Sequence, residues 1–451
     1  MTDSPFAIRG VIEGFYGTPW THEQRTTLID FLAHKQMNTF VYAPKDDSLV
    51  RHDWRTMYTG TELSRLSELI EACRARDIDF VYCLSPGLSI EYSSAADRDR
   101  LVAKLESVAA LGVDDFGLLL DDIPPTLQHP TDADAFADLV TAHIDLVDDI
   151  FSRSPGSGRF FVCPTQYWGL GNEDYIVQLG RGLDPRIDLL WTGRAICSAT
   201  LDLADAAAFA ESTGRRPTYW DNYPVNDVAM TYELHVGPYL GRDPRLHESA
   251  TGIIANGMEL FESSTIAFAT IADYLIAPDD YDAEASWTDA IRSVAGSDAD
   301  DYAVFADNVR TSCLSADDAP TLQRALDSFF FHRSFGDVAA AADELSDLAD
   351  RLARAADHLL RGKVENPQLM AEARPWIAAF EVGAMAIRKI AELHRAGKLE
   401  VDGPRVLGPY LTSLRDARVR VFGDVLDMAL AELTGLGPPK PHDHIITAPS
   451  Q

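Results

Sequence analysis

The sequence predicts an α/β protein, a (β/α)8 TIM barrel followed by a C-terminal α-helical bundle domain. Up to about residue 285, short runs rich in Val, Ile, Leu, Phe and Tyr alternate with amphipathic helical stretches, the pattern of a parallel sheet covered by helices. From about residue 286 the strand signals vanish, and Ala, Leu, Asp and Arg recur at helical spacing. With 451 residues the chain is also longer than a single small domain, which favours a barrel plus a second unit. We therefore expect the barrel over residues 1–285, the bundle over 286–436 and a flexible Pro-rich tail over 437–451.

Eight segments have the composition of strands that are buried on both faces. Helical segments lie between most of them, and the first begins with Thr21 followed three residues later by Gln24, the pattern of a capping box. Eight strands alternating with helices suit a (β/α)8 barrel. A doubly wound open sheet is the alternative, but no GxGxxG follows the first strand. The expected strands are 8–15, 38–42, 78–83, 115–120, 159–163, 187–191, 218–220 and 252–255.

The C-terminal part lacks this alternation. Helical periodicity is clearest over residues 338–360, 376–393 and 411–433, which together predict a helical bundle. From Gly437 the sequence continues as GPPKPHDHII, and its prolines predict a loose tail.

The charge and the cysteines exclude some classes of partner and location. Seventy acidic residues against 39 basic ones give a formal charge of −31, which argues against nucleic acid and anionic membrane surfaces as partners. The N-terminus has no basic segment before an apolar one, and no run of about 18 apolar residues occurs, so we expect neither a signal peptide nor a membrane span. Five cysteines without CxxC spacing suit a reducing cytoplasm.

The ends of the predicted strands carry the functional signal, because the active site of such a barrel lies at the C-terminal ends of its strands. Polar and aromatic residues follow seven of the eight strands. Aromatic rings that stack on sugars, next to carboxylates and amides that bond hydroxyl groups, predict a carbohydrate pocket. These strand ends are 13–17, 42–47, 121–122, 164–167, 191–193, 220–222 with Asp227 shortly after, and Asn256.

Asp121 and Asp122 are the strongest catalytic candidates. Asp-Asp occurs seven times in this acidic chain, and the other six pairs mostly flank turns or helix ends, where a solvated surface or a helix cap is the ordinary explanation. Asp121-Asp122 instead follows the buried strand sequence FGLLL and precedes Ile123-Pro124-Pro125. Charges at the mouth of a buried strand are costly unless they have a task. Because side chains alternate along a strand, both can face one ligand only if the backbone turns there, which the prolines favour.

Other catalytic motifs are absent from the sequence: no HExxH, P-loop, GxSxG or Cys-His zinc spacing occurs. The twelve histidines are scattered, and His442 and His444 in the tail are weak metal candidates at best. We therefore expect neither a catalytic metal nor a cofactor.

Several strand ends resemble glycoside hydrolase family 84, which comprises the O-GlcNAcases and related bacterial β-N-acetylglucosaminidases. The resemblance covers about residues 8–275 and is specific, because independent motifs at successive strand ends agree in order. They are GVIEGFYGTPW at 10–20, YAPKDD at 42–47, LDDI at 120–123, CPTQY at 163–167, WTG at 191–193, WDN at 220–222, ND at 226–227 and GPY at 237–239.

The resemblance implies a (β/α)8 barrel that hydrolyses terminal β-linked N-acetylglucosamine with retention of configuration. In this family the substrate's own acetamido oxygen attacks C1 and forms an oxazoline, so the enzyme supplies no nucleophile, unlike the usual two-carboxylate scheme. The resemblance also implies that Asp121 orients the acetamido N–H and that Asp122 is first the general acid and then the general base.

The resemblance also implies the sugar-binding residues. Lys45, Asp227 and Asn256 would bond the hydroxyl groups, with the Gly14 backbone close to the ring. Asn222 and Tyr167 would support the acetamido group and the oxazoline oxygen. Trp220 would form a wall of the N-acetyl pocket and Thr192 would line it, whereas Trp191 is expected in the core.

Two alternative functions stay open at this point. A hyaluronidase-like hydrolase of amino-sugar polymers would keep the barrel, although the acidic composition makes a polyanionic substrate less suitable. A non-catalytic GlcNAc-binding protein would have no use for both Asp121 and Asp122. The natural substrate is open between protein O-GlcNAc and other GlcNAc-bearing glycoconjugates, and the helical domain could form part of a homodimer interface or of the cleft rim.

Overall fold

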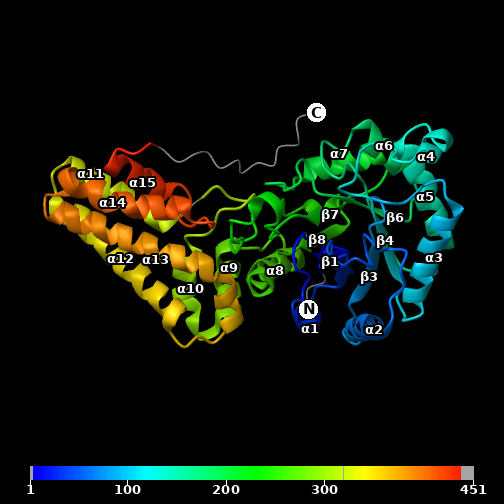
Figure 1. Cartoon of the computed structure of the whole chain (residues 1–451), viewed down its shortest axis with the longest axis horizontal. Helices are drawn as coiled ribbons and strands as arrows, with labels where there is room; N and C mark the ends of the chain where they lie inside the picture. Colours follow the sequence, from blue (N-terminus) through cyan, green and yellow to red (C-terminus); the bar gives the residue numbers. More distant parts are fainter. Residues whose placement is uncertain (1–3, 318, 438–451) are drawn as a thin grey trace.

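Eight parallel strands form a closed barrel in the computed structural model, which describes residues 4–317 and 319–437 (Figure 1). The strands follow one another around the barrel in chain order, and β8 pairs with β1 so that Ile8 lies opposite Gly252. Each begins and ends within two residues of its predicted limits, which confirms the expected fold class. They are β1 (Ile8–Glu13), β2 (Thr39–Tyr42), β3 (Asp79–Leu84), β4 (Asp115–Leu119), β5 (Phe160–Cys163), β6 (Ile187–Trp191), β7 (Thr218–Asp221) and β8 (Gly252–Asn256).

Helices connect these strands and cover the outside of the barrel. The first of them begins with the predicted capping box: the Gln24 amide N–H donates to the Thr21 hydroxyl (3.2 Å), and the Thr21 amide donates to the Gln24 side chain (2.8 Å). The helices are α1 (His22–His34), α2 (Gly60–Arg74), α3 (Ala95–Ala109), α4 (Pro130–Ala135), α5 (Leu139–Arg153), α6 (Asp174–Gly182), α7 (Leu203–Thr213) and α8 (Phe261–Ile276), with short 3-10 turns η1 (Val228–Met230) and η2 (Leu246–Glu248) between β7 and β8.

Apolar side chains fill the barrel interior, so the barrel is a packed core. The strands therefore supply a rigid base for whatever is attached to their C-terminal ends. Cys163 and Trp220, at the ends of β5 and β7, belong to this interior cluster. The interior residues are Ile8, Ile12, Val41, Ala43, Val81, Cys83, Leu119, Phe161, Cys163, Leu190, Trp220 and Ile254.

The helical unit follows the barrel and lies beside it (Figure 1). Its core includes Leu234, Val236, Met258 and Ile266 from the barrel side, so the two units share buried apolar contacts. The predicted boundary at residue 285 falls in the first turn of α9. The elements are α9 (Ala283–Ala295), η3 (Gly296–Asp298), α10 (Ala299–Ala306), α11 (Pro320–Ser334), α12 (Val338–Arg361), α13 (Pro367–Arg395), α14 (Leu399–Asp416) and α15 (Val425–Thr434).

The expectation of a helix over 411–433 is wrong, because the chain leaves helical geometry between α14 and α15. Phe422 and Gly423 both have positive φ angles, +65° and +52°. Phe422 is fully buried and stacks on Phe380 at 5.6 Å between ring centroids, and its amide N–H donates to the Asn308 carbonyl (2.7 Å). Burial of this ring offsets the cost of a left-handed residue.

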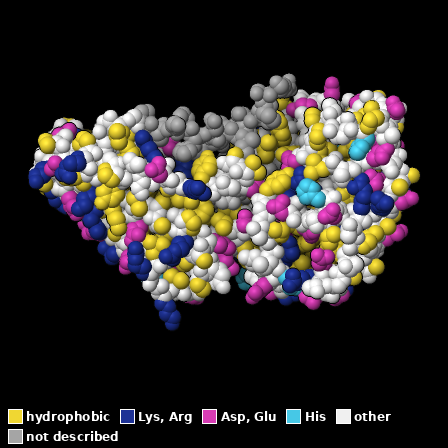
Figure 2. Space-filling model, in the orientation of Figure 1, with side chains coloured by type: hydrophobic (Ala, Val, Ile, Leu, Met, Phe, Trp, Pro, Cys, Tyr) yellow, Lys and Arg dark blue, Asp and Glu magenta, His cyan; other side chains and the backbone are white. Residues whose placement is uncertain are grey.

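Charged side chains of both signs are scattered over the barrel and the helical unit on the face seen in Figure 2. Among the described residues, none of the helices has the length and apolar character needed to cross a membrane. Most of the predicted tail, including His442 and His444, lies outside the described residues.

Candidate active site

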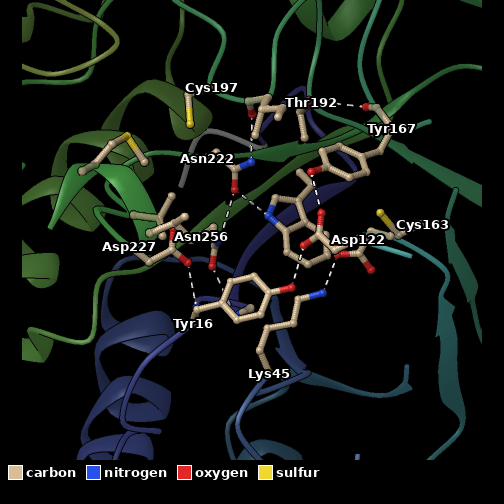
Figure 3. A pocket seen from close by; sticks show the side chains of 17 residues that line it. Tyr16, Lys45, Asp122, Cys163, Tyr167, Thr192, Cys197, Asn222, Asp227 and Asn256 are labelled. Atoms are coloured by element: carbon tan, nitrogen blue, oxygen red, sulfur yellow. Dashed lines mark hydrogen bonds and ion pairs between the residues drawn. The ribbon is translucent and has the colours of Figure 1, made fainter. Parts of the chain in front are cut away.

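A pocket of about 370 Å³ opens at the C-terminal ends of the strands, and all ten predicted site residues line it (Figure 3). Each comes from a strand end or the loop that follows, so the closed barrel brings together residues that are up to 242 positions apart in the chain, as for Gly14 and Asn256. The ten residues are Gly14, Lys45, Asp121, Asp122, Tyr167, Thr192, Trp220, Asn222, Asp227 and Asn256. Seven further lining residues were not predicted, namely Tyr16, Cys163, Ile196, Cys197, Val225, Val228 and Met230.

Asp121 and Lys45 form a buried ion pair in this pocket. Lys45 Nζ donates a short hydrogen bond to Asp121 Oδ2, and the two side chains are only 2% and 6% exposed. The other carboxylate oxygen, Oδ1, is buried and has no hydrogen-bond partner among the described residues. Because a buried acceptor without a partner is costly, Oδ1 is suited to a donor supplied by a ligand.

The backbone turns at Asp122, as the strand-end argument required. Its φ angle is +53°, in the left-handed region that non-glycine residues rarely adopt. On a regular strand Asp121 and Asp122 would face opposite sides of the sheet. The left-handed turn instead lets both side chains line the same pocket. Such a conformation costs roughly 1–3 kcal/mol and persists only where the surroundings enforce it.

Two phenol groups hold the Asp122 carboxylate (Figure 3). The hydroxyl of Tyr16 donates to Oδ2 (2.8 Å) and that of Tyr167 donates to Oδ1 (2.9 Å). Burial, together with the charge of Asp122, raises the pKa of both tyrosines above the usual value, so both are neutral donors. Arg51 in turn donates to the Tyr16 oxygen (2.7 Å). The sequence signals for Tyr16 are its place at the first strand end and within the motif GVIEGFYGTPW.

A network of amides fixes the opposite side of the pocket. Asn222 Oδ1 accepts from the Trp220 indole N–H (2.9 Å) and from Asn256 Nδ2 (3.0 Å). Asn222 Nδ2 donates to the Ile196 carbonyl (2.8 Å), which sets the orientation of its amide. The Gly14 amide donates to Asn256 Oδ1 (3.2 Å), and a Cβ on Gly14 would lie 2.5 Å from the Trp220 ring. Glycine is therefore required for the chain directly after β1 to pass this close to the indole.

Asp227 lies on the loop between β7 and β8, immediately before η1. Its Oδ2 accepts the backbone N–H of Tyr16 (2.7 Å), which links this loop to the end of β1. Burial raises the pKa of Asp227, and the negative charge of Asp122 adds to the effect. Val228, the next residue, is 69% exposed and has a φ angle of +52°, which is unusual for a β-branched side chain.

Thr192 and Trp191 occupy different environments at the end of β6. Thr192 lines the pocket, and its hydroxyl donates to the Ala195 carbonyl (2.7 Å). Trp191 is buried and stacks on Phe209 with 4.6 Å between ring centroids. It lies in the core, where it was expected.

Among residues 4–317 and 319–437, no cluster of three or more His, Cys, Asp or Glu side chains has the arrangement of a metal site. The pocket combines a lysine-paired carboxylate, a carboxyl group between two phenols, an indole wall and several fixed amides. This arrangement can hold a polar ring, present an acceptor to an amide N–H and transfer a proton.

Comparisons with known proteins agree with this chemistry. The model of the β-N-acetylglucosaminidase family matches residues 9–307. The protein O-GlcNAcases of Rattus norvegicus and Mus musculus are each 35% identical to this chain over 271 residues, which is 59% of this chain and 29% of theirs. This chain therefore spans less than a third of the length of those curated relatives.

Two solved structures extend the likeness to nearly the whole chain. A mutant of the O-GlcNAc hydrolase of Thermobaculum terrenum has a TM-score of 0.88 at 30% identity, and the match covers 95% of this chain and 94% of that one. The protein CpGH84B has a TM-score of 0.85 at 26% identity, covering 96% of this chain and 77% of that one. Both matches include the helical unit as well as the barrel.

Proposed function

Because the chain belongs to the β-N-acetylglucosaminidase family of glycoside hydrolases, we propose that it hydrolyses terminal β-linked N-acetylglucosamine with retention of configuration. The acetamido group of the substrate is the nucleophile. The observation that carries this proposal is the left-handed turn at Asp122, which directs two consecutive carboxylates with different partners into one pocket.

In the first step the acetamido carbonyl oxygen forms a bond to C1 while the bond from C1 to the leaving oxygen breaks. Asp121 accepts the acetamido N–H and increases the nucleophilicity of the carbonyl oxygen. Its buried Oδ1 supports this role, since it has no other hydrogen-bond partner among the described residues. Lys45 keeps the carboxylate in place through Oδ2.

Asp122 donates the proton that the leaving oxygen acquires. In the second step a water molecule attacks C1, the bond from C1 to the oxazoline oxygen breaks, and Asp122 takes the proton of the water. The hydroxyls of Tyr16 and Tyr167 support this exchange, because they stabilise the carboxylate after the proton has left.

The other lining residues bind the sugar. Lys45, Asp227 and Asn256 bond its hydroxyl groups, and the Gly14 backbone lies close to the ring. Asn222 and Tyr167 support the acetamido group and the oxazoline oxygen, while Trp220 and Thr192 border the N-acetyl pocket. The hydrogen bonds that already fix Asn222 and Asn256 support these roles, because a preorganised site loses little entropy on binding.

Proteins that carry O-linked N-acetylglucosamine are the substrate class we propose. The names of the curated relatives and of the Thermobaculum terrenum structure support it. The formal charge of −31 is unfavourable for a polyanionic amino-sugar polymer. The cytoplasmic location and the homodimer stay predictions from the sequence.

A pair of chromogenic substrates tests the proposal. A nitrophenyl β-N-acetylglucosaminide is expected to be hydrolysed, and the corresponding β-glucoside, which lacks the acetamido nucleophile, is not. Comparable rates on both substrates would contradict the substrate-assisted mechanism. An O-GlcNAc glycopeptide assayed next to a chitin oligosaccharide then tests the substrate class, and a preference for the oligosaccharide would contradict it.

A further inference from the structure

A buried histidine belongs to the same β7–β8 loop as Asp227. His235 is 1% exposed, and both of its ring nitrogens contact other residues of this loop. Nδ1 lies 3.0 Å from the Pro224 carbonyl oxygen and 2.9 Å from that of Val225, and Nε2 lies 2.9 Å from Glu233 Oε2. The imidazole also stacks on the Tyr223 ring, at 6.1 Å between centroids.

These contacts favour a doubly protonated ring at His235. Carbonyl oxygens only accept hydrogen bonds, so Nδ1 carries a proton. The Arg420 guanidinium lies 3.3 Å from Glu233 Oε1, and the other carboxylate oxygen of Glu233 faces Nε2, which suits a proton on this nitrogen as well. Burial opposes the charged ring, but the hydrogen bond and charge of Glu233 outweigh it and raise the pKa of His235, and the nearby Cys313 thiol acts in the same direction. The Tyr223 phenol is a further ionisable group that faces the ring.

The same cluster connects the helical unit to the sugar pocket. The Trp376 indole on α13 and the Arg420 backbone N–H both donate to the Tyr232 carbonyl, at 3.0 and 2.8 Å. Next along the loop, the Glu233 carbonyl accepts from Asn226 Nδ2 (2.7 Å). Asn226 precedes Asp227, whose carboxylate accepts from the Tyr16 backbone.

We propose that His235 is a positioning residue for the sugar pocket: as an imidazolium held by Glu233, it fixes the Pro224 and Val225 carbonyls and thereby the Asp227 carboxylate, and Arg420 makes the helical unit part of this support. The inference rests on the proposed function, since Asp227 is taken to bind the sugar. When the imidazolium loses its proton, a nitrogen lone pair faces the Glu233 carboxylate. The segment from Pro224 to Asp227 is then held less firmly in its place. We therefore expect the Michaelis constant to rise at alkaline pH, and the rate of the chemical step to change less.

The test compares the full-length wild-type protein with His235→Gln, Glu233→Gln and the control His358→Gln. His358 forms a similar pair with Asp298 (2.7 Å), but it lies on α12, outside the β7–β8 loop. KM and kcat for the nitrophenyl β-N-acetylglucosaminide are measured between about pH 5 and pH 9, and free N-acetylglucosamine binding is measured by calorimetry.

For His235→Gln we expect KM to increase about tenfold, because the loss of a charge-assisted hydrogen bond weakens binding by about a factor of ten. We expect kcat to stay within about threefold of wild type and KM to show no rise at alkaline pH. In Glu233→Gln the alkaline rise of KM moves to lower pH, and His358→Gln behaves as wild type. If His235→Gln does not fold, the Glu233→Gln profile decides.

The inference is overturned if the alkaline limb of KM is the same in wild type and Glu233→Gln, or if His235→Gln binds N-acetylglucosamine as wild type does at every pH. Failure of the proposed function has a different signature, because the wild-type protein itself would then not hydrolyse the substrate.

Discussion

The pair Asp121 and Asp122 shows how neighbouring side chains of one type acquire different partners. Asp121 is tied to a buried ammonium group, whereas Asp122 contacts two neutral phenols. The separation depends on one backbone angle, the left-handed φ of Asp122. Two carboxylates with different hydrogen-bond partners thus stand next to each other in the chain.

Replacing Asp122 by Asn tests its role as the proton donor. We expect kcat/KM for a substrate with a poor leaving group, such as an O-GlcNAc peptide, to fall by roughly 10²–10⁴, the usual contribution of general acid catalysis. A dinitrophenyl glycoside needs little protonation and should lose far less in the first step. Steady-state kinetics on both substrates measure the difference.

Asp121→Asn is the matched variant for that experiment. It removes the acceptor for the acetamido N–H, so both substrates should lose activity by similar factors. A smaller loss than in Asp122→Asn on the dinitrophenyl substrate would reverse the assignment of the two residues.

Asp227→Asn is expected to change the thermal stability and the sugar affinity in opposite directions. The folded pKa of Asp227 is raised by burial and by Asp122, so its ionisation opposes folding. This penalty is absent below the unfolded pKa near 3.9, grows as the pH rises toward the folded pKa and is complete above it. We expect Asp227→Asn to melt slightly higher than wild type at pH 7 but not near pH 3, and to bind N-acetylglucosamine more weakly. The exposed Asp134→Asn on α4 is the control, and an unchanged or lower melting temperature at pH 7 would contradict the argument.

At the scale of elements, the end of α13 nearest the barrel caps a barrel helix. The Glu372 carboxylate accepts the backbone N–H groups of Glu262 (3.0 Å) and Ser263 (2.8 Å), in the first turn of α8. These amide groups have no partner within α8 itself. The carboxylate therefore acts as an N-terminal cap supplied from outside the helix and lies at the positive end of the helix dipole.

Glu372→Ala should lower the free energy of unfolding by about 1–2 kcal/mol, the usual effect of losing a helix cap. Glu372→Gln should be milder because an amide oxygen still accepts. Denaturant unfolding of both variants measures the difference, with the exposed Glu344→Ala on α12 as the control. Equal stability of Glu372→Ala and wild type would show that water replaces the cap.

The sequence predicted the elements where local pattern and burial agree. The strands were found because apolar residues such as those of 116–120 are buried in the barrel wall, and the capping box of Thr21 and Gln24 is purely local. The break between α14 and α15 was missed because it depends on Phe422 packing against Phe380, far away in the chain. Tyr16 and the cluster of His235 also escaped prediction. The carboxylate that Tyr16 contacts follows β4, and the Arg420 side chain reaches Glu233 from the segment between α14 and α15.

At the scale of the whole molecule, the barrel and the helical unit are joined by a shared apolar core. Val236 and Met258 from the barrel side belong to the same buried cluster as Trp287 of α9. The Trp287 indole donates to the Val236 carbonyl (2.6 Å) within this contact. Since each unit would expose apolar surface without the other, we expect them to unfold together.

Phe380→Ala provides the test of this coupling, because Phe380 is fully buried in α13 and contacts Phe305 and Phe422. The cavity should cost about 3–5 kcal/mol, and in a cooperative molecule this loss reaches the barrel although no barrel residue has changed. Far-UV circular dichroism reports mainly on the helices, and hydrolytic activity remaining during heating reports on the pocket. Both midpoints should fall together, whereas Val401→Ala, at an 81% exposed position on α14, should leave them unchanged. A lower midpoint by circular dichroism with an unchanged activity midpoint would mean that the barrel holds its pocket without the helical unit.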